Sequence, residues 1–298
     1  ASYSTRQQWR LASDVEWWSP GNAVEVDALL RWSEFPFQFF GIGRAPSDTA
    51  EDYTPRQLEL QVSGQWRVPG RTGWYLGARY AFQDVRIRER APGGALSVGN
   101  LTGSTGARTA LAGLGVVRDS RDDILAPHRG VFAALWQLEG GAIVGSATRL
   151  GRTTLDIRTY HALGASQPST MGATPWVLAT QAMIEGVRGT VPFDRLPQLG
   201  GQNLLRGNVL GRFRDEVVAA AQVELRSPIL WRRLGVVAFA GVGDVARGLG
   251  ELRLQRPVTS LGGGVRWRLS RRERLNVRLD VARGLDGTGV YLWIGEAF

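Results

Sequence analysis

The chain contains no cysteine and no lysine. Without cysteine it has no disulfide framework and no thiolate chemistry, which suits either a reducing cytosol or an envelope protein without bridges. All 36 basic residues are arginine, and against 27 acidic residues they give a formal net charge of +9. These arginines are spread along the chain among acidic residues instead of clustering on one segment. The pattern therefore does not favour nucleic-acid binding.

The chain is also poor in the residues of common catalytic and metal sites. Only two histidines are present, His128 and His161, so metal sites of the usual spacing are not expected. No Gly-x-Ser-x-Gly nucleophile elbow occurs. The adjacent Asp122 and Asp123 fit a solvated turn better than an acid and base pair. We expect no catalytic residue, no metal and no cofactor.

Long apolar runs are missing as well. A membrane-spanning helix needs roughly 18 to 20 apolar residues, and the best run here covers only residues 234–242. The chain does not start with a basic segment followed by an apolar one, so a secretory signal is either absent or already removed. If this chain crosses a membrane, it must do so with strands.

Period-two alternation of apolar and polar residues is the strongest positive signal. In residues 57–68 the apolar Leu58, Leu60, Val62 and Trp66 alternate with side chains that are almost all polar. About thirteen segments share this pattern and are predicted to be strands: residues 8–18, 24–33, 57–68, 74–83, 109–117, 131–139, 153–160, 176–185, 222–226, 234–242, 260–269, 274–281 and 290–298.

Strand length and tryptophan placement separate a membrane barrel from a soluble β-sandwich, barrel or propeller. Soluble strands average about five or six residues, whereas a tilted transmembrane strand needs about nine to eleven, as predicted for most segments here. Nine tryptophans lie near predicted strand ends, where aromatic girdles of membrane barrels sit: Trp9, Trp17, Trp18, Trp32, Trp66, Trp74, Trp176, Trp231 and Trp267.

Connections between the predicted strands alternate in length. Tight turns at residues 19–22, 69–72 and 270–273 alternate with longer loops at 41–53, 91–105, 187–214 and 246–257. Short periplasmic turns and long extracellular loops are typical of bacterial outer-membrane barrels. If the short turns are periplasmic, the last strand descends and Phe298 ends there, facing lipid in register with Leu292 and Ile294.

We therefore predict an all-β fold, a transmembrane antiparallel β-barrel of 14 to 16 strands with about 13 recognised in the chain. A closed barrel with both termini on one side needs an even number of strands. One or three N-terminal strands are then expected in addition, unless the count of thirteen is off by one.

Several segments resemble the motifs of one family. These segments occur along the chain in the order that is typical of that family. They are residues 119–122 (Asp-Ser-Arg-Asp) with 127–130 (Pro-His-Arg-Gly), 199–207 ending in Arg-Gly, 224–228, 262–266 and 294–298. The chain is similar over about residues 36–298 to the bacterial surface antigen family, the superfamily of assembly and translocation barrels that includes BamA, TamA and FhaC. Residues 39–43 and 53–56 are similar to a subgroup that lacks N-terminal periplasmic transport domains.

The resemblance implies a single barrel domain, residues 1–298, whose long loop 187–214 folds into the lumen. Arg206 of the Arg206-Gly207 pair would dock on acidic residues of the inner wall, for which Glu224 and Asp280 are the candidates. The alternative is that Arg206 is a solvated loop arginine. Family members usually carry an aromatic residue where this chain has Asn208, and often an aspartate where it has Gly241. The family's turn motif corresponds here to Asp119, Arg121, Asp122 and Gly130.

The same resemblance implies a non-enzymatic protein of the bacterial outer membrane that inserts or translocates proteins or lipids. Its partners would be outer-membrane lipid and lipopolysaccharide, client outer-membrane proteins or a periplasmic partner, and no nucleic acid. Phe298 resembles the terminal aromatic signal by which such barrels reach the assembly machinery. Two alternatives stay open: a passive, anion-favouring pore or structural barrel, and a soluble β-protein that binds an acidic ligand.

Overall fold

A computed structural model of the protein describes residues 2–3, 9–99, 101–164, 175–230, 233–253, 255–270 and 273–298. Strands dominate it. Their bounds are β1 (Ser2–Tyr3), β2 (Trp9–Trp18), β3 (Val24–Glu34), β4 (Phe37–Phe39), β5 (Glu51–Arg67), β6 (Trp74–Arg90), β7 (Arg108–Asp119), β8 (Gly130–Gly140), β9 (Leu150–Leu163), β10 (Trp176–Gly189), β11 (Gln198–Leu199), β12 (Phe213–Arg214), β13 (Val217–Arg226), β14 (Leu234–Ala246), β15 (Val258–Arg268), β16 (Asn276–Gly284) and β17 (Gly287–Ile294).

Helical structure is confined to short pieces in the loops. The described residues include one α-helical turn, α1 (Ala95–Val98), and 3-10 turns η1 (Pro20–Asn22), η2 (Ala142–Val144), η3 (Phe193–Arg195) and η4 (Leu249–Glu251). None of the described helices is long and apolar enough to cross a membrane.

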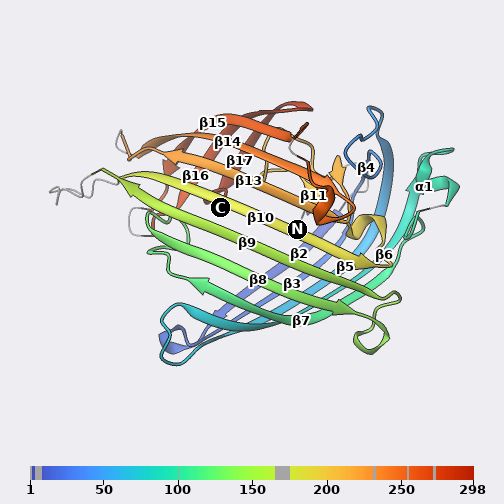
Figure 1. The fold of residues 1–298 in the computed structure, drawn as a ribbon, viewed down its shortest axis with the longest axis horizontal. Coiled ribbons are helices and arrows are strands. Elements are labelled where there is room, and N and C mark those ends of the chain that lie inside the picture. The colour runs from blue at the N-terminus through green and yellow to red at the C-terminus, as the bar shows by residue number, and fades with distance from the viewer. Residues whose placement is uncertain are drawn as a thin grey trace.

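One antiparallel sheet of 15 strands curves around the molecule (Figure 1). Its order follows the chain from β1 to β17, with β4 added beside β5 and the pair β11–β12 forming a separate small sheet. The thirteen long strands, β2, β3, β5 to β10 and β13 to β17, match the thirteen predicted segments. Short β1 pairs with β2 before them. Within the described chain, β17 pairs with β16 alone, so its other edge has no strand beside it.

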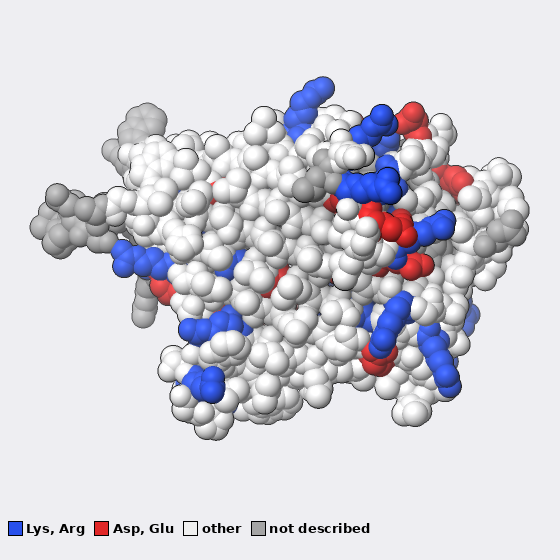
Figure 2. Space-filling view, in the orientation of Figure 1, with Lys and Arg blue, Asp and Glu red and all other residues white. Residues whose placement is uncertain are grey.

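The barrel wall is apolar outside and polar inside. On β13, Val223 and Leu225 are 39% and 37% exposed, whereas Gln222, Glu224 and Arg226 between and beside them are buried. Soluble sheets bury the apolar face, so this inverted pattern is the one expected of a barrel whose outer wall contacts lipid. Charged side chains gather toward the end of the molecule where β4, β11 and α1 lie, and the surface over the front strands is mostly uncharged (Figure 2).

Exposed tryptophans mark one boundary of this apolar surface. Trp17, Trp66, Trp74, Trp176 and Trp267 lie at the ends of β2, β5, β6, β10 and β15 on the side of the short turns, and all are well exposed. They form the aromatic girdle that the sequence predicted. The predicted member Trp231 lies outside the described residues.

Several strand ends differ from the predicted ones, for example in β5, β6 and β17. Strands β5 and β6 each run for 17 residues, because their pairing continues from the wall to Tyr53 opposite Arg90. At the other extreme, β17 stops at Ile294 instead of reaching residue 298.

The prediction that Phe298 faces lipid is wrong. Gly295 has a φ of +97°, a left-handed conformation that favours glycine, and the chain turns inward there. Phe298 is only 6% exposed and packs with Tyr160, Val177 and Ala179, whereas Leu292 and Ile294 are exposed as predicted. The alternation identified the outer face of β17 but did not show where the strand ends.

Candidate functional site

The connection between β10 and β13 packs against the inner wall of the barrel. It carries η3 and the paired strands β11 and β12. Leu199, Leu205 and Phe213 of this loop are buried against Val218 of β13 and Val245 of β14. Full burial of such side chains stabilises by roughly 1.5 to 3 kcal/mol each, so the loop has an apolar anchor of its own. It begins slightly later than predicted, because β10 continues to Gly189.

Arg206 lies at the inner end of this loop and is 1% exposed. Its Nη2 donates to Glu224 Oε2 at 2.7 Å, and its Nη1 donates to Asp280 Oδ2 at 2.5 Å. The guanidinium also stacks 3.4 Å above the centre of the Phe239 ring. Both predicted partners therefore contact Arg206 at once, one from β13 and one from β16.

Three further arginines and one glutamate complete a buried charge cluster around Arg206. Arg226 Nε lies 2.8 Å from Glu224, Arg266 Nη1 lies 2.6 Å from Asp280, and Arg278 Nη1 lies 3.7 Å from Asp280. Arg266 Nε also donates to Glu296 Oε2 at 2.6 Å. Opposite charges this close offset the large cost of removing each from water, so the cluster is stable only as a set.

Two glycines of β15 make room for this cluster. A Cβ on Gly264 would lie 2.1 Å from Asp280 Oδ1, and one on Gly262 would lie 2.5 Å from the Phe239 ring. The two glycines thus leave the space that these side chains occupy. Any larger residue there would displace the carboxylate and the ring that hold Arg206.

Residues 1–285 match the Omp85 superfamily domain. The chain belongs to the Omp85 superfamily. No curated protein matches it in sequence. The fold is similar to the crystal structure of BamA from Haemophilus ducreyi lacking POTRA domains 1-3, with a TM-score of 0.60 and 14% identity over 96% of this chain. It is also similar to CdiB from Acinetobacter baumannii, with a TM-score of 0.61 and 11% identity over 97% of this chain. The chain spans 60% and 50% of those two structures.

Asn208 and Gly241, the two positions at which we expected this chain to depart from the family, have clear local roles. Asn208, in place of an aromatic residue, is 1% exposed and donates to the carbonyl oxygens of Leu205 and Thr259 at 3.0 and 2.8 Å. Its Oδ1 accepts a hydrogen bond from the backbone N–H of Leu285 at 2.9 Å. Gly241, in place of aspartate, lies beneath Leu205, where a Cβ would come within 2.7 Å of that side chain. This Omp85 chain thus fixes the loop with an amide and a packed leucine at the two positions.

The Asp-Ser-Arg-Asp motif builds the connection between β7 and β8. Arg121 pairs with Asp119 at 2.6 Å, and Asp122 accepts backbone N–H bonds from His128 and Arg129 at 2.8 and 3.1 Å. Gly130 has a φ of +109°, and a Cβ on it would lie 2.2 Å from the Ser120 carbonyl oxygen.

The same connection is tied to a turn far away in the sequence. Arg274, in the turn between β15 and β16, pairs with Asp122 at 2.8 Å. Burial acts to raise the pKa of Asp122, but the hydrogen bonds from Arg274 and from the backbone outweigh it and hold that pKa below its usual value. The four motif residues form this turn and do not contact Arg206 in the described structure.

Phe298, which the sequence predicted to face lipid, instead belongs to the buried charge cluster around Arg206. Its carbonyl oxygen accepts a hydrogen bond from Arg226 Nη2 at 2.9 Å, and its ring lies 5.5 Å from that guanidinium. Burial acts to raise the pKa of neighbouring Glu296, but Arg266 and Arg226 hold it below its usual value. Arg226, Arg266 and Arg278 lie on the polar side of the alternating pattern in residues 222–226, 260–269 and 274–281. That pattern gives no sign that residues 296–298 join them.

A separate group of acidic residues is the candidate cation-binding site among the described residues. Glu16, Glu25 and Asp27 on β2 and β3 can each offer one carboxylate oxygen, and these oxygens lie within 4.8 Å of one another. Oxygen ligands suit hard cations such as calcium or magnesium. Exposed acidic groups are common without an ion, so we assign these three carboxylates no function.

Proposed function

We propose that this chain is a barrel of the bacterial outer membrane that inserts or translocates proteins. Its superfamily and its inverted barrel wall support the membrane location. The observation that carries the activity is the outer edge of β17, which has no strand beside it in the described chain. An unpaired edge presents a row of free N–H and C=O groups on which another chain can pair.

The short length and the glycines of β17 support a strand whose outer edge can pair with a client strand and release it. The strand has only eight residues, and Gly284, Gly287 and Gly289 lie at its junction with β16. Glycine weakens a strand because it loses more backbone entropy on folding than other residues and makes no cross-strand side-chain contact. A client strand could therefore pair with β17 and leave it again at low cost.

The occupied lumen weighs against the alternative of a passive, anion-favouring pore. The loop that carries Arg206 is held across the inner wall by ion pairs to β13 and β16 and by apolar packing. A pore for small anions would need a continuous water path at this position. We assign the arginine-rich inner wall to holding the loop.

The edge proposal can be tested by cross-linking, because the chain has no cysteine of its own. Leu292 of β17 and Leu279 of β16 face each other in register, and both side chains are exposed on the outer face. A client strand paired with β17 would lie one strand spacing, about 4.8 Å, from Leu292 and about twice that from Leu279. Leu279→Cys is thus a matched control for Leu292→Cys.

The probe is a urea-denatured outer-membrane β-barrel precursor with one cysteine in its last strand, added to vesicles that contain either variant. We expect a disulfide with Leu292→Cys and only background with Leu279→Cys, because disulfides need Cα atoms closer than about 7 Å. We also expect faster precursor folding than in empty vesicles. Equal cross-linking of both variants, or no acceleration together with a large steady ion current, would instead favour the pore.

A further inference from the structure

The loop between β8 and β9, residues 141–149, folds outward onto the barrel wall. Tyr80 Oη of β6 donates to the Val144 carbonyl oxygen at 3.2 Å. Ala110 of β7 is fully buried, although Leu114, on the same face of that strand, is 72% exposed. Ile143 at the tip of this loop is fully exposed. An apolar side chain is thus presented to the surroundings from a loop that is fixed to the outer wall.

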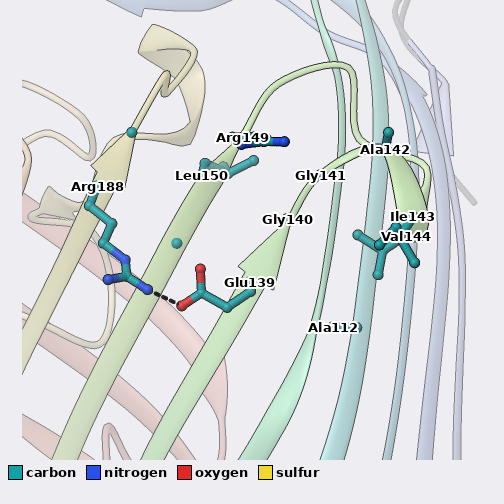
Figure 3. A pocket seen from close by; sticks show the side chains of 12 residues that line it. Ala112, Glu139, Gly140, Gly141, Ala142, Ile143, Val144, Arg149, Leu150 and Arg188 are labelled. Atoms are coloured by element: carbon teal, nitrogen blue, oxygen red, sulfur yellow. Dashed lines mark hydrogen bonds and ion pairs between the residues drawn. The ribbon is translucent and has the colours of Figure 1, made fainter.

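A cavity of about 680 Å³ lies between this loop and the strands beneath it (Figure 3). Its apolar lining includes Ala112, Val144 and Leu150, and its charged lining consists of Arg149, Arg188 and Glu139. Arg188 reaches from β10 to Glu139 on β8, with side chains 72% and 53% exposed. In the described part of the chain the Arg149 guanidinium has no ion-pair partner. The cavity therefore holds two cations and one carboxylate beside an apolar wall.

The cavity lies at the long-loop boundary of the apolar surface. Strand β10 has 14 residues and runs from Trp176, in the girdle on the side of the short turns, to Gly189. At about 3.3 Å per residue and a tilt of about 40°, such a strand rises about 33 Å, whereas the apolar band of these barrels is about 25 Å tall. Arg188 is the next-to-last residue of β10 and so lies just beyond the hydrocarbon, at the level of lipid headgroups.

We propose that this cavity binds the phosphate group of a phosphorylated lipid in the leaflet on the long-loop side. Arg149 and Arg188 bind the phosphate, Ile143 inserts among the lipids, and the acyl chains follow the apolar outer face of β7 to β9. Guanidinium groups bind phosphate through paired, charge-assisted hydrogen bonds. The proposal rests on the barrel spanning a membrane, as proposed above, and is independent of any client.

Substitution of Glu139 should change lipid binding in the opposite direction to substitution of the two arginines. An exposed ion pair contributes about 0 to 1 kcal/mol, so Arg188 can exchange Glu139 for a phosphate. Glu139 also repels the phosphate, so Glu139→Gln is expected to strengthen lipid binding, whereas Arg149→Gln and Arg188→Gln weaken it. If these residues served only to fold the loop, breaking the pair from either side would act in the same direction.

The binding test uses the full chain in phosphatidylcholine nanodiscs with added diphosphoryl lipid A, and measures bound lipid by native mass spectrometry. We expect Arg149→Gln with Arg188→Gln to lower binding about tenfold and Glu139→Gln to raise it severalfold. Arg247→Gln, which changes an exposed arginine in the loop between β14 and β15, is the matched control and should leave binding unchanged.

Three results would overturn the proposal: equal binding of dephosphorylated lipid A, an equal loss in the Arg247→Gln control, or displacement of the lipid by millimolar inorganic phosphate alone. Heat-modifiable migration on a gel checks that each variant still forms the barrel. A chain that stays soluble without detergent would contradict the membrane barrel itself, which separates that failure from failure of this site.

The position of the loop can be tested separately with one fluorescent label. Because the chain has no cysteine, Ile143→Cys gives a single attachment site for an environment-sensitive dye. Leu249→Cys is the control, since Leu249 is also an exposed apolar residue but lies in the loop between β14 and β15. We expect a blue shift on insertion into membranes for the label at 143 and none at 249. A label at 143 that stays water-exposed would contradict the proposal.

Discussion

Arg206 shows why an arginine is suited to the inner wall of this barrel. Its planar fork reaches Glu224 and Asp280 from one side chain, while its face covers the Phe239 ring. A lysine has one donor nitrogen and no planar group, so it cannot reproduce both the forked hydrogen bonds and the stacking on Phe239. All of these groups are withdrawn from water, so the loss of any one leaves its partners buried without compensation.

Replacing Arg206 with Ala should therefore destabilise the barrel. Glu224 and Asp280 would each lose a partner, and breaking a buried ion pair costs about 3 to 5 kcal/mol of unfolding free energy. Because other arginines of the cluster still contact both carboxylates, we expect a loss of about 3 kcal/mol. The temperature at which the folded gel band disappears measures this effect. Arg206→Lys keeps the charge without the fork, and its transition temperature should lie between those of the wild type and Arg206→Ala. An unchanged transition in Arg206→Ala would show that the loop does not depend on these ion pairs.

The tie between Asp122 and Arg274 should depend on pH in a defined direction. The pKa of Asp122 in the folded protein lies below its ordinary value of 3.8, so the carboxylate stabilises the fold above that pH and its contribution disappears as the pH falls through the lowered pKa. Both side chains are about one-third exposed, so the effect should be below about 1 kcal/mol.

The measurement compares the thermal transition of the wild type with that of Asp122→Asn between pH 2 and pH 7. The variant should be less stable above about pH 4, and the difference should shrink at lower pH as the wild-type carboxyl group becomes protonated. A difference that grows toward low pH would contradict this account of the turn.

At the scale of elements, the sequence predicted the strands well and the contacts between distant elements poorly. Alternation revealed each wall strand, because one face must meet lipid and the other the lumen, and the pattern on β13 and β16 placed Glu224 and Asp280 on the inner face. It could not show that Arg226, Arg266 and Arg278 converge on the same point. Convergence depends on the register between strands and on the curvature of the sheet, which no single strand encodes.

Strand ends were predicted least well, and Phe298 is the instructive case. An alternating pattern has no internal mark for the residue at which a chain leaves the sheet, so residues 295–298 were read as strand. The deciding feature is the left-handed Gly295, after which Glu296 and Phe298 enter the lumen. A glycine near the end of a strand gives only a weak hint of such a turn.

The approach of the long loop to β16 can be tested at Gly207. Gly207 and Gly201 both have a φ of +95°, so alanine brings similar backbone strain to either, of the order of 1 to 2 kcal/mol. Only at 207 would the new Cβ strike the wall, 2.4 Å from the backbone nitrogen of Gly284, whereas at 201 the nearest atom lies 3.5 Å away on Leu210.

We therefore expect Gly207→Ala to lower the thermal transition more than Gly201→Ala and to make the loop sensitive to added protease. The difference between the two variants isolates the contact with β16 from the strain that they share. Equal effects in both would mean that the loop does not approach the wall as closely as these distances indicate.

At the scale of the whole molecule, the lumen is obstructed from both ends. The loop that carries Arg206 enters from the long-loop end, and Phe298 fills the inner wall near Tyr160 toward the short turns. The connection between β7 and β8 adds to this second obstruction, because Asp122 reaches Arg274 in the turn between β15 and β16. Cavities of about 210 and 310 Å³ lie along the inner wall beside these segments.

Two obstructions in series predict a specific pattern of ion conductance in planar bilayers. Residues 200–212 connect β11 to β12, whose ends pair at Leu199 and Phe213, so a two-residue Asn-Gly turn can replace the loop tip and keep the small sheet. The wild type should conduct little, because both obstructions are present. Phe298→Ala alone should change little, since the loop still blocks the path. The loop replacement alone should raise the current, and the combination should raise it by more than the two separate increases together.

This pattern follows because a path in series conducts only as well as its narrowest part, so removal of the second obstruction matters only after the first is gone. The gel assay of the folded band must show that each variant still forms the barrel before its current is compared. If Phe298→Ala alone opened the barrel as much as the loop replacement, the chain end and not the Arg206 loop would be the tighter obstruction. The buried charge cluster would then hold a loop that does not control the lumen.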